Sequence, residues 1–209
     1  MSPALRTLRH RCAAENLLVL LPGAGMQPEH YVENGFFAAV DHHASKLGLL
    51  AVDLELDALS SGKAIPAIVD QILRPARADY ASLWLGGLLA LSLNADFPGL
   101  ADGLCLLAPY PGSRLTTNAI ERAGGLDSWQ PTAEEMSDPE YRAYNWLKAP
   151  PTDFPVYLGY GEADRFAEGM DFIAARFPAA ARQVVPGGHD WPAWLLLWEH
   201  FLALAHFSI

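Results

Sequence analysis

The sequence alternates short apolar runs with longer stretches whose apolar residues recur at helical spacing. Short runs that are apolar throughout are typical of strands buried on both faces by helices, which is the arrangement of a parallel sheet. The helical stretches expected are 36–47, 64–76, 88–95 and 191–206, and the strands expected are 17–21, 49–53, 82–85, 103–108, 156–159 and 182–185. The pattern predicts a three-layer α/β/α sandwich around a mostly parallel sheet of about six strands.

One long segment interrupts this alternation. Residues 110–151 contain no clear strand, although they hold several prolines, glycines and aromatic residues. A stretch of this length is uncommon as a bare loop inside a compact domain, so we expect a short helical insertion with helices at 133–136 and 139–147. Two interpretations remain open. The insertion is a cap that shapes a pocket with aromatic residues such as Trp129, Tyr141, Tyr144 and Trp146, or it is a packed excursion without a binding role.

Length and composition indicate how many domains the protein has and which kinds of partner are not expected. The 209 residues suit one domain, and we expect residues 1–209 to form a single α/β unit with its insertion at about 110–151. Hydrophobic residues make up 51% of the chain, and the formal net charge is −10. Because an acidic protein repels phosphate backbones, nucleic acid is not an expected partner, and no apolar run is long enough to indicate a membrane span.

The two cysteines and the N-terminal residues give information about the cellular compartment of the protein. Cys105 lies in an apolar run and reads as a small buried hydrophobe, and nothing around Cys12 favours a disulfide between them. We therefore expect reduced thiols and a cytoplasmic protein. The stretch before Glu15 holds Arg6, Arg9, His10 and Arg11 and no acidic residue, which weakly resembles a targeting segment, but a frayed basic leader is the simpler interpretation.

Candidate functional residues follow the strands. Parallel strands place their carboxyl ends at one edge of the sheet, where ligands of such folds bind. Gly23, Ala24 and Gly25 follow the first strand and could offer backbone N–H groups to an oxyanion. Asp164 follows the fifth strand and His189 the sixth. A carboxylate next to a histidine can fix the imidazole tautomer so that its other nitrogen acts as a base.

These residues resemble the α/β-hydrolase family, in a short form without the first two strands. The resemblance runs from Leu17 onward and depends on three motifs: Leu-Pro-Gly-Ala-Gly at 21–25, Gly-Glu-Ala-Asp-Arg-Phe at 161–166 and Gly-Gly-His-Asp-Trp at 187–191. It implies Asp164 as the catalytic acid, His189 as the base and the N–H of Ala24 as an oxyanion donor. It also implies acyl hydrolysis of a small ester or thioester substrate, without a cofactor or a metal.

The serine nucleophile of that family is not found. The family carries it on a Gly-x-Ser-x-Gly turn after the third strand of this chain, where the sequence reads Leu-Trp-Leu-Gly-Gly-Leu-Leu-Ala over 83–90. If Gly86 and Gly87 match the closing glycine pair, Trp84 takes the serine position. The nearby serines lack the context of that turn; they are Ser60, Ser61, Ser82, Ser92 and Ser113.

Three explanations stay open. About five residues that carry the serine are missing from this sequence relative to the family pattern, the protein is an inactive member that keeps the fold, or the site serves an unrelated use. The first is favoured because the strand expected at 82–85 is short for a buried central strand. We therefore expect a serine hydrolase of the carboxylesterase or thioesterase type, with a catalytically inactive binding or interaction protein as the alternative.

Overall fold

The computed structural model describes residues 5–23, 25–43, 46–54, 64–87, 89–177 and 182–204. Its centre is a sheet of seven strands in the order β1-β3-β2-β4-β5-β6-β7. The strands are β1 (Thr7–His10), β2 (Asn16–Leu21), β3 (Leu47–Val52), β4 (Ser82–Gly87), β5 (Gly103–Leu107), β6 (Val156–Gly161) and β7 (Arg182–Val185). All neighbouring pairs are parallel except β1 and β3. The mostly parallel sheet confirms the predicted fold class.

Strand β1 was not expected from the sequence. It pairs antiparallel with β3, from Thr7 opposite Val52 to His10 opposite Leu49. Arg6, directly before it, forms ion pairs with Glu29 and with Asp53, the second at 2.6 Å. The interpretation of this segment as a frayed basic leader is therefore wrong for residues 5–11, because their backbone completes one edge of the sheet and Arg6 is held by two carboxylates.

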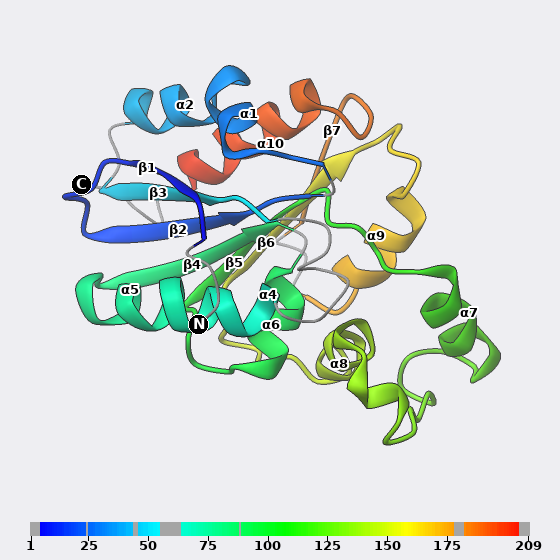
Figure 1. Ribbon diagram of the computed structural model, residues 1–209. Helices are drawn as coiled ribbons and strands as arrows, with labels where there is room; N and C mark the ends of the chain where they lie inside the picture. The colour runs from blue at the N-terminus through cyan, green and yellow to red at the C-terminus, as the bar shows by residue number, and fades with distance from the viewer. Residues whose placement is uncertain are drawn as a thin grey trace.

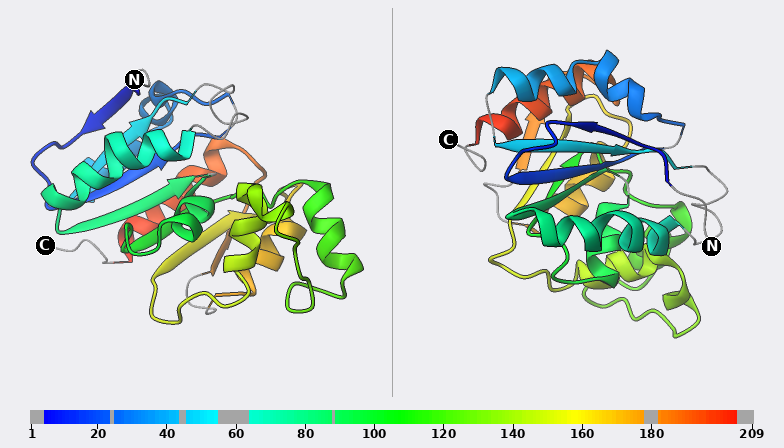
Figure 2. Two further views of the ribbon diagram at one scale, coloured as in Figure 1. Left: turned by 60° about the horizontal axis from the view of Figure 1, so that its bottom comes forward. Right: turned by 60° about the vertical axis from the view of Figure 1, so that its left-hand side comes forward.

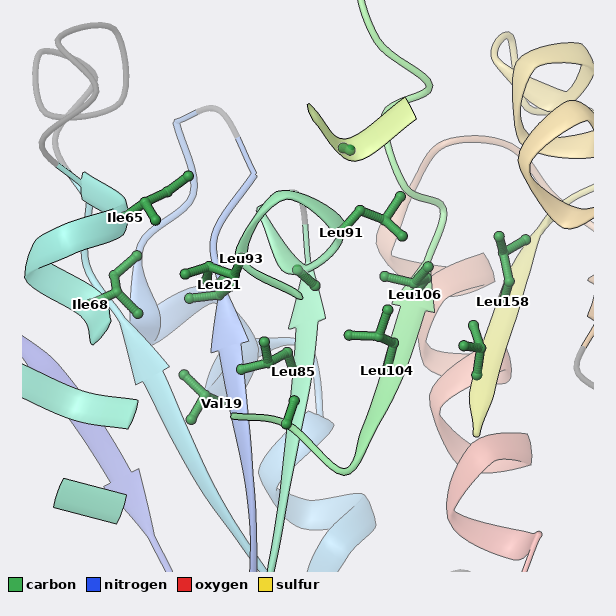
Figure 3. Packing of buried hydrophobic residues seen from close by; sticks show 14 of the residues in the cluster. Val19, Leu21, Ile65, Ile68, Leu85, Leu91, Leu93, Leu104, Leu106 and Leu158 are labelled. Carbon is green, nitrogen blue, oxygen red and sulfur yellow. The ribbon is translucent and has the colours of Figure 1, made fainter. Parts of the chain in front are cut away.

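The alternation of side chains along each strand divides the core between the two faces of the sheet. In β2, Leu17, Val19 and Leu21 point into one hydrophobic cluster, while Leu18 and Leu20 point into the other. Figure 3 shows the first cluster, where strand residues meet residues of the helices that cover this face; it labels Val19, Leu21, Leu85, Leu104, Leu106 and Leu158 from strands, and Ile65, Ile68, Leu91 and Leu93 from helices. Burial on both faces explains why the strand sequences are apolar throughout.

Helices cover both faces and complete the three layers (Figure 1). One face carries α1 (Pro28–Glu33), α2 (Phe36–His42) and α10 (Trp191–Ala203). The other carries α4 (Ala64–Ile68), α5 (Arg74–Asp79), α6 (Ala90–Asp96) and α9 (Ala167–Ala174). A π-helical turn at Val69–Leu73 joins α4 to α5, so the helix expected at 64–76 is a continuous helical stretch with one widened turn. The sequence pattern did not indicate α1 or α9.

The segment 110–151 forms α7 (Arg114–Arg122), a 3₁₀ turn (Glu135–Ser137) and α8 (Pro139–Trp146). Helix α8 packs against α6, and Figure 2 shows both helices of the segment at one end of the molecule beside that layer. Its aromatic residues are packing residues: Trp129 and Tyr144 are buried in the core, and Trp129 contacts Tyr141 with ring centroids 5.3 Å apart. These contacts favour the interpretation of a packed excursion.

Within the described part of the chain, no helix combines the length and apolar character required to cross a membrane.

Candidate functional site

Two loops at the carboxyl edge of the sheet are held together by backbone contacts. The loop after β6 donates from the N–H of Glu162 to Val185 O at 2.8 Å and from the N–H of Ala163 to Gly187 O at 2.9 Å. Gly161 makes this approach possible, because a Cβ there would lie 2.6 Å from the carbonyl oxygen of Gly188. The glycines around β6 and β7 thus bring the turn that carries Asp164 against the turn that carries His189.

Asp164 and His189 form a hydrogen-bonded pair in which Nδ1 of His189 lies 2.7 Å from Oδ2 of Asp164. The Asp164 side chain is fully buried, whereas that of His189 is 27% exposed. The other carboxylate oxygen of Asp164 accepts a hydrogen bond from the N–H of Phe166 at 2.9 Å. The carboxylate is therefore fixed from two sides, and a proton on Nδ1 of His189 leaves Nε2 as the nitrogen that could act as a base.

Two aromatic rings contact the imidazole of His189. Phe166 meets it edge to face with centroids 5.3 Å apart, and Trp194 does the same at 5.0 Å. Trp194 comes from α10, whose N-terminus is capped by Asp190 through the N–H of Ala193 at 3.1 Å. The ring of His189 is thus oriented by the carboxylate of Asp164 and by two aromatic side chains. The sequence analysis identified Asp164 but did not place Phe166 or Trp194 in the site.

A cavity of about 490 Å³ opens beside His189. Most of its wall is apolar or aromatic, which is typical of small-molecule sites. The described residues that line it are Leu20, Leu21, Gly23, Met26, Tyr31, Phe36, Gly86, Gly87, Cys105, Leu107, Ala108, Pro109, Tyr110, Arg165, Phe166, His189, Trp191 and Trp194. Of the described residues of the inserted segment 110–151, only Tyr110, at its start, lines this cavity. No serine or threonine is among the described lining residues.

Strand β4 is longer than the sequence pattern indicated, and this changes the position of Trp84. The strand continues to Gly87, which pairs with Leu21 at the carboxyl end of β2. Trp84 pairs with Leu18 and Gly103 in the middle of the sheet, and only 5% of it is exposed. The expected strand end at Leu85 is wrong, because the two glycines extend the ladder. A residue at position 84 cannot reach the strand edge where a nucleophile would lie.

Trp84 has a packing role instead. Its indole Nε1 donates to Oγ of Ser82 at 2.9 Å, and its ring meets Phe201 of α10 with centroids 5.6 Å apart. The ring lies against Gly103, where a Cβ would come within 2.6 Å of it. Trp84 therefore fills the space that the missing side chain of Gly103 leaves open between the sheet and α10.

Gly87 marks the end of the strand at the cavity wall. Its φ is +100°, a conformation that L side chains rarely adopt, and a Cβ would lie 2.8 Å from the carbonyl carbon of Leu21. Only glycine fits this position next to β2. Helix α6 then begins at Ala90, so Leu88 and Leu89 are the residues between strand and helix. Leu88 itself lies outside the described residues.

The serines named from the sequence do not reach the cavity wall where they are described. Ser82 starts β4 at the opposite end of the strand, and Ser92 lies within α6 with its hydroxyl 3.4 Å from Pro139 O. Ser113 caps α7 and donates to Oε1 of Glu140 at 3.0 Å. Ser60 and Ser61 lie outside the described residues. The structure thus brings Asp164 and His189 together without a described serine or threonine at the cavity wall beside them.

The predicted oxyanion residues are described only in part. Gly23 lines the cavity, but its N–H points to the sulfur of Met26, 3.2 Å away. Gly25 has a φ of +73° and is exposed. Ala24 lies outside the described residues. Their role as donors, like the catalytic roles of Asp164 and His189, stays a prediction.

Cys105 is the one cavity-lining residue with a thiol among those described. It lies within β5 on the α10 face, pairs with Gly86, and is 1% exposed. Burial raises the pKa of the Cys105 thiol well above its usual range, which disfavours the thiolate that a nucleophile requires. The sequence-based interpretation of Cys105 as a small buried hydrophobe agrees with its surroundings.

No protein-family model matches the sequence, and a comparison with curated proteins gives no match. Solved structures do resemble it. A putative esterase from Staphylococcus aureus has a TM-score of 0.62 at 12% identity, over 100% of this chain and 82% of its own. An α/β-hydrolase enzyme from a metagenome of sediments of the Mar Chica lagoon, Morocco, has a TM-score of 0.61 at 14% identity, over 99% and 94%. The monoacylglycerol lipase of Paleococcus ferrophilus has a TM-score of 0.57 at 12% identity, over 95% and 98%.

At such low identities the likeness concerns the arrangement of the chain. The neighbours span nearly the whole of this sequence, and the sheet order and helical layers described above account for the similarity. The chain has the α/β-hydrolase fold.

Proposed function

We propose that the cavity beside His189 is an acyl-binding site of the ester or thioester hydrolase type, in which His189 is the base and Asp164 orients it. The observation that carries this proposal is the 2.7 Å contact between the buried carboxylate and Nδ1 of a partly exposed imidazole at the wall of an apolar cavity. A buried carboxylate next to histidine is costly unless it is paired, so a site that maintains the pair is a functional candidate.

The chemistry requires a nucleophile that the described lining residues do not include. With a serine at the strand edge, its Oγ would attack the substrate carbonyl while Nε2 of His189 takes the proton. His189 would then give that proton to the departing alcohol or thiol. Water would attack the acyl-serine next, and its proton would pass through the same nitrogen to release the acid and restore the serine.

The end of β4 suggests where that serine belongs. Gly86 and Gly87 lie at the end of the strand and line the cavity, so they fit the opening side of a Gly-x-Ser-x-Gly turn better than its closing pair. In this alignment about five residues, with the serine second among them, are missing between Gly87 and Leu88 relative to the family pattern. The sequence after that point continues directly into α6. This alignment replaces the one that placed Trp84 on the serine position.

The pair of Asp164 and His189 at the cavity wall also supports a second function, that of a binding protein. A chain that keeps the cavity and the pair of Asp164 and His189, but has no serine or threonine beside them, could bind an acyl ligand without turning it over. The described lining residues favour this alternative for the sequence as it stands.

Two measurements distinguish the two functions. Protein expressed from the full gene is treated with a fluorophosphonate probe, and its intact mass is compared with 22.7 kDa. A mass larger by about five residues together with labelling supports the hydrolase. A mass that matches, with no labelling and no turnover of nitrophenyl esters, supports the binding protein. Labelling of a serine in a protein of matching mass would contradict both, because no serine or threonine lines the cavity among the described residues.

A further inference from the structure

The cavity combines an apolar aromatic wall with one permanently charged side chain at its mouth. Among the described lining residues, Arg165 is the one that carries a fixed charge. It is exposed, and its guanidinium carbon lies 4.7 Å from the centroid of the Phe166 ring. Tyr110 meets the same ring edge to face at 5.5 Å. The cation is therefore positioned on an aromatic surface that continues to His189.

The hydrogen-bond donors of the Arg165 guanidinium are not used within the described part of the chain. Over the described residues it makes no hydrogen bond or ion pair, and its one recorded contact is the ring of Phe166. This contrasts with Arg6, Arg142 and Arg176, each of which pairs with a carboxylate. Arg165 is thus a cation without a carboxylate partner at the cavity wall, in a protein of formal net charge −10. Stacking on Phe166 limits the entropy that the side chain would lose on binding an anion.

A second donor lies in the same wall. Nε1 of Trp194 is buried and has no hydrogen-bond partner, which holds for no other buried side-chain nitrogen or oxygen in the described part of the chain. Trp194 lines the cavity and contacts His189. An unsatisfied buried donor costs free energy, and an oxygen atom of a ligand that reached it would remove that cost.

We infer that the site selects ligands with an apolar body and a carboxylate at the far end from the scissile group, with Arg165 as the residue that determines this specificity. The inference rests on the proposed function, since it names the substrate class of the same cavity: half-esters and half-thioesters of dicarboxylic acids, or esters of equivalent shape and charge. The apolar part lies along the aromatic wall, the carbonyl lies near His189, and the carboxylate pairs with the guanidinium.

Binding tests this without requiring turnover. Isothermal titration calorimetry of the whole chain compares three benzyl esters of similar length: anionic monobenzyl succinate, neutral benzyl succinamate and cationic benzyl γ-aminobutyrate. We expect the anionic ester to bind roughly tenfold more tightly than the neutral one, and the cationic ester to bind most weakly. The preference should shrink as the salt concentration rises.

Three variants assign the preference to Arg165. Arg165→Gln should remove it while leaving the affinity for benzyl succinamate unchanged, and Arg165→Lys should retain part of it. Arg114→Gln is the matched control, because it removes the same charge from an exposed position at the start of α7, outside the cavity. Equal affinity for the three esters, equal effects of the two glutamine variants, or no binding of any ester would overturn the inference. None of these outcomes bears on whether His189 activates a nucleophile, which probe labelling tests separately.

Discussion

The imidazole of His189 lies with its Nδ1 atom 2.7 Å from Oδ2 of Asp164, and the second oxygen of the same carboxylate is held by the backbone N–H of Phe166. The neutral imidazole should therefore carry its proton on Nδ1 and leave Nε2 free. Long-range nitrogen–proton NMR correlation of the neutral ring reads the tautomer directly. We expect the Nδ1–H form in the chain as it is, and a loss of that preference in Asp164→Asn. An Nε2–H tautomer in the unsubstituted protein would contradict the assigned roles.

Gly161 controls how closely the two loops of the site approach each other. In Gly161→Ala the new Cβ would meet the carbonyl oxygens of Gly187 and Gly188, and these are backbone atoms that cannot rotate away. We expect a loss of about 1–3 kcal/mol in the free energy of unfolding, measured by urea denaturation. Gly188→Ala is the control, because its Cβ would have its closest contact at 3.4 Å, an ordinary van der Waals distance. Similar losses in both variants would show that the approach of the loops is not the cause.

Substitution of Trp84 tests whether this residue has a packing role or lies in the site. Trp84→Ser creates a serine at the position that sequence alignment alone would assign to the nucleophile. Because this side chain packs against Phe201 and over Gly103, we expect a loss of about 3–5 kcal/mol in the free energy of unfolding and no reaction with a fluorophosphonate. Trp84→Phe should recover much of the stability, since the ring still fills the space. Labelling of the serine variant while it is folded would place position 84 at the strand edge and refute the register of β4.

The two cysteines should differ in reactivity. Cys12 is exposed and Cys105 is buried, and burial raises the pKa of the Cys105 thiol. A raised pKa keeps the thiol protonated up to higher pH, so reaction with Ellman's reagent at mildly alkaline pH should titrate one thiol rapidly and the second only after unfolding. Cys12→Ser should abolish the fast phase. A fast phase that survives in this variant would mean that Cys105 is accessible from the cavity.

Much of the fold could be predicted from the sequence because its signals are local. Strands such as β2 and β3 are apolar throughout, and burial on both faces requires that. The motifs around Asp164 and His189 could also be found, since glycines mark the turns that carry them. Strand β1 was not predicted because it lies at the edge of the sheet and its residues alternate between exposed and half-buried. The hydrophobic pattern of such an edge strand is weak.

Other parts of the site depend on contacts that sequence spacing does not encode. The ring of Phe166 comes from the loop after β6 and that of Trp194 from the first turns of α10, and both contact His189. The end of β4 was misjudged because two glycines rarely extend a strand, yet here Gly86 and Gly87 both pair with β2. At Gly87 no side chain would fit beside Leu21. From the sequence alone, Trp84 could lie either in the middle of the strand or at its end, because the glycines that follow it are compatible with both positions.

We propose that this fold keeps Asp164 and His189 as acid and base and has no nucleophile after β4 among its described residues. The most direct measurement is fluorophosphonate labelling of a variant in which a segment of about five residues, completing a Gly-x-Ser-x-Gly turn, is inserted between Gly87 and Leu88. We expect labelling of the inserted serine and turnover of nitrophenyl esters, both lost when His189→Ala is added, and neither in the chain without the insertion. A folded insertion variant that is not labelled, or one whose labelling and turnover are unaffected by His189→Ala, would contradict the claim.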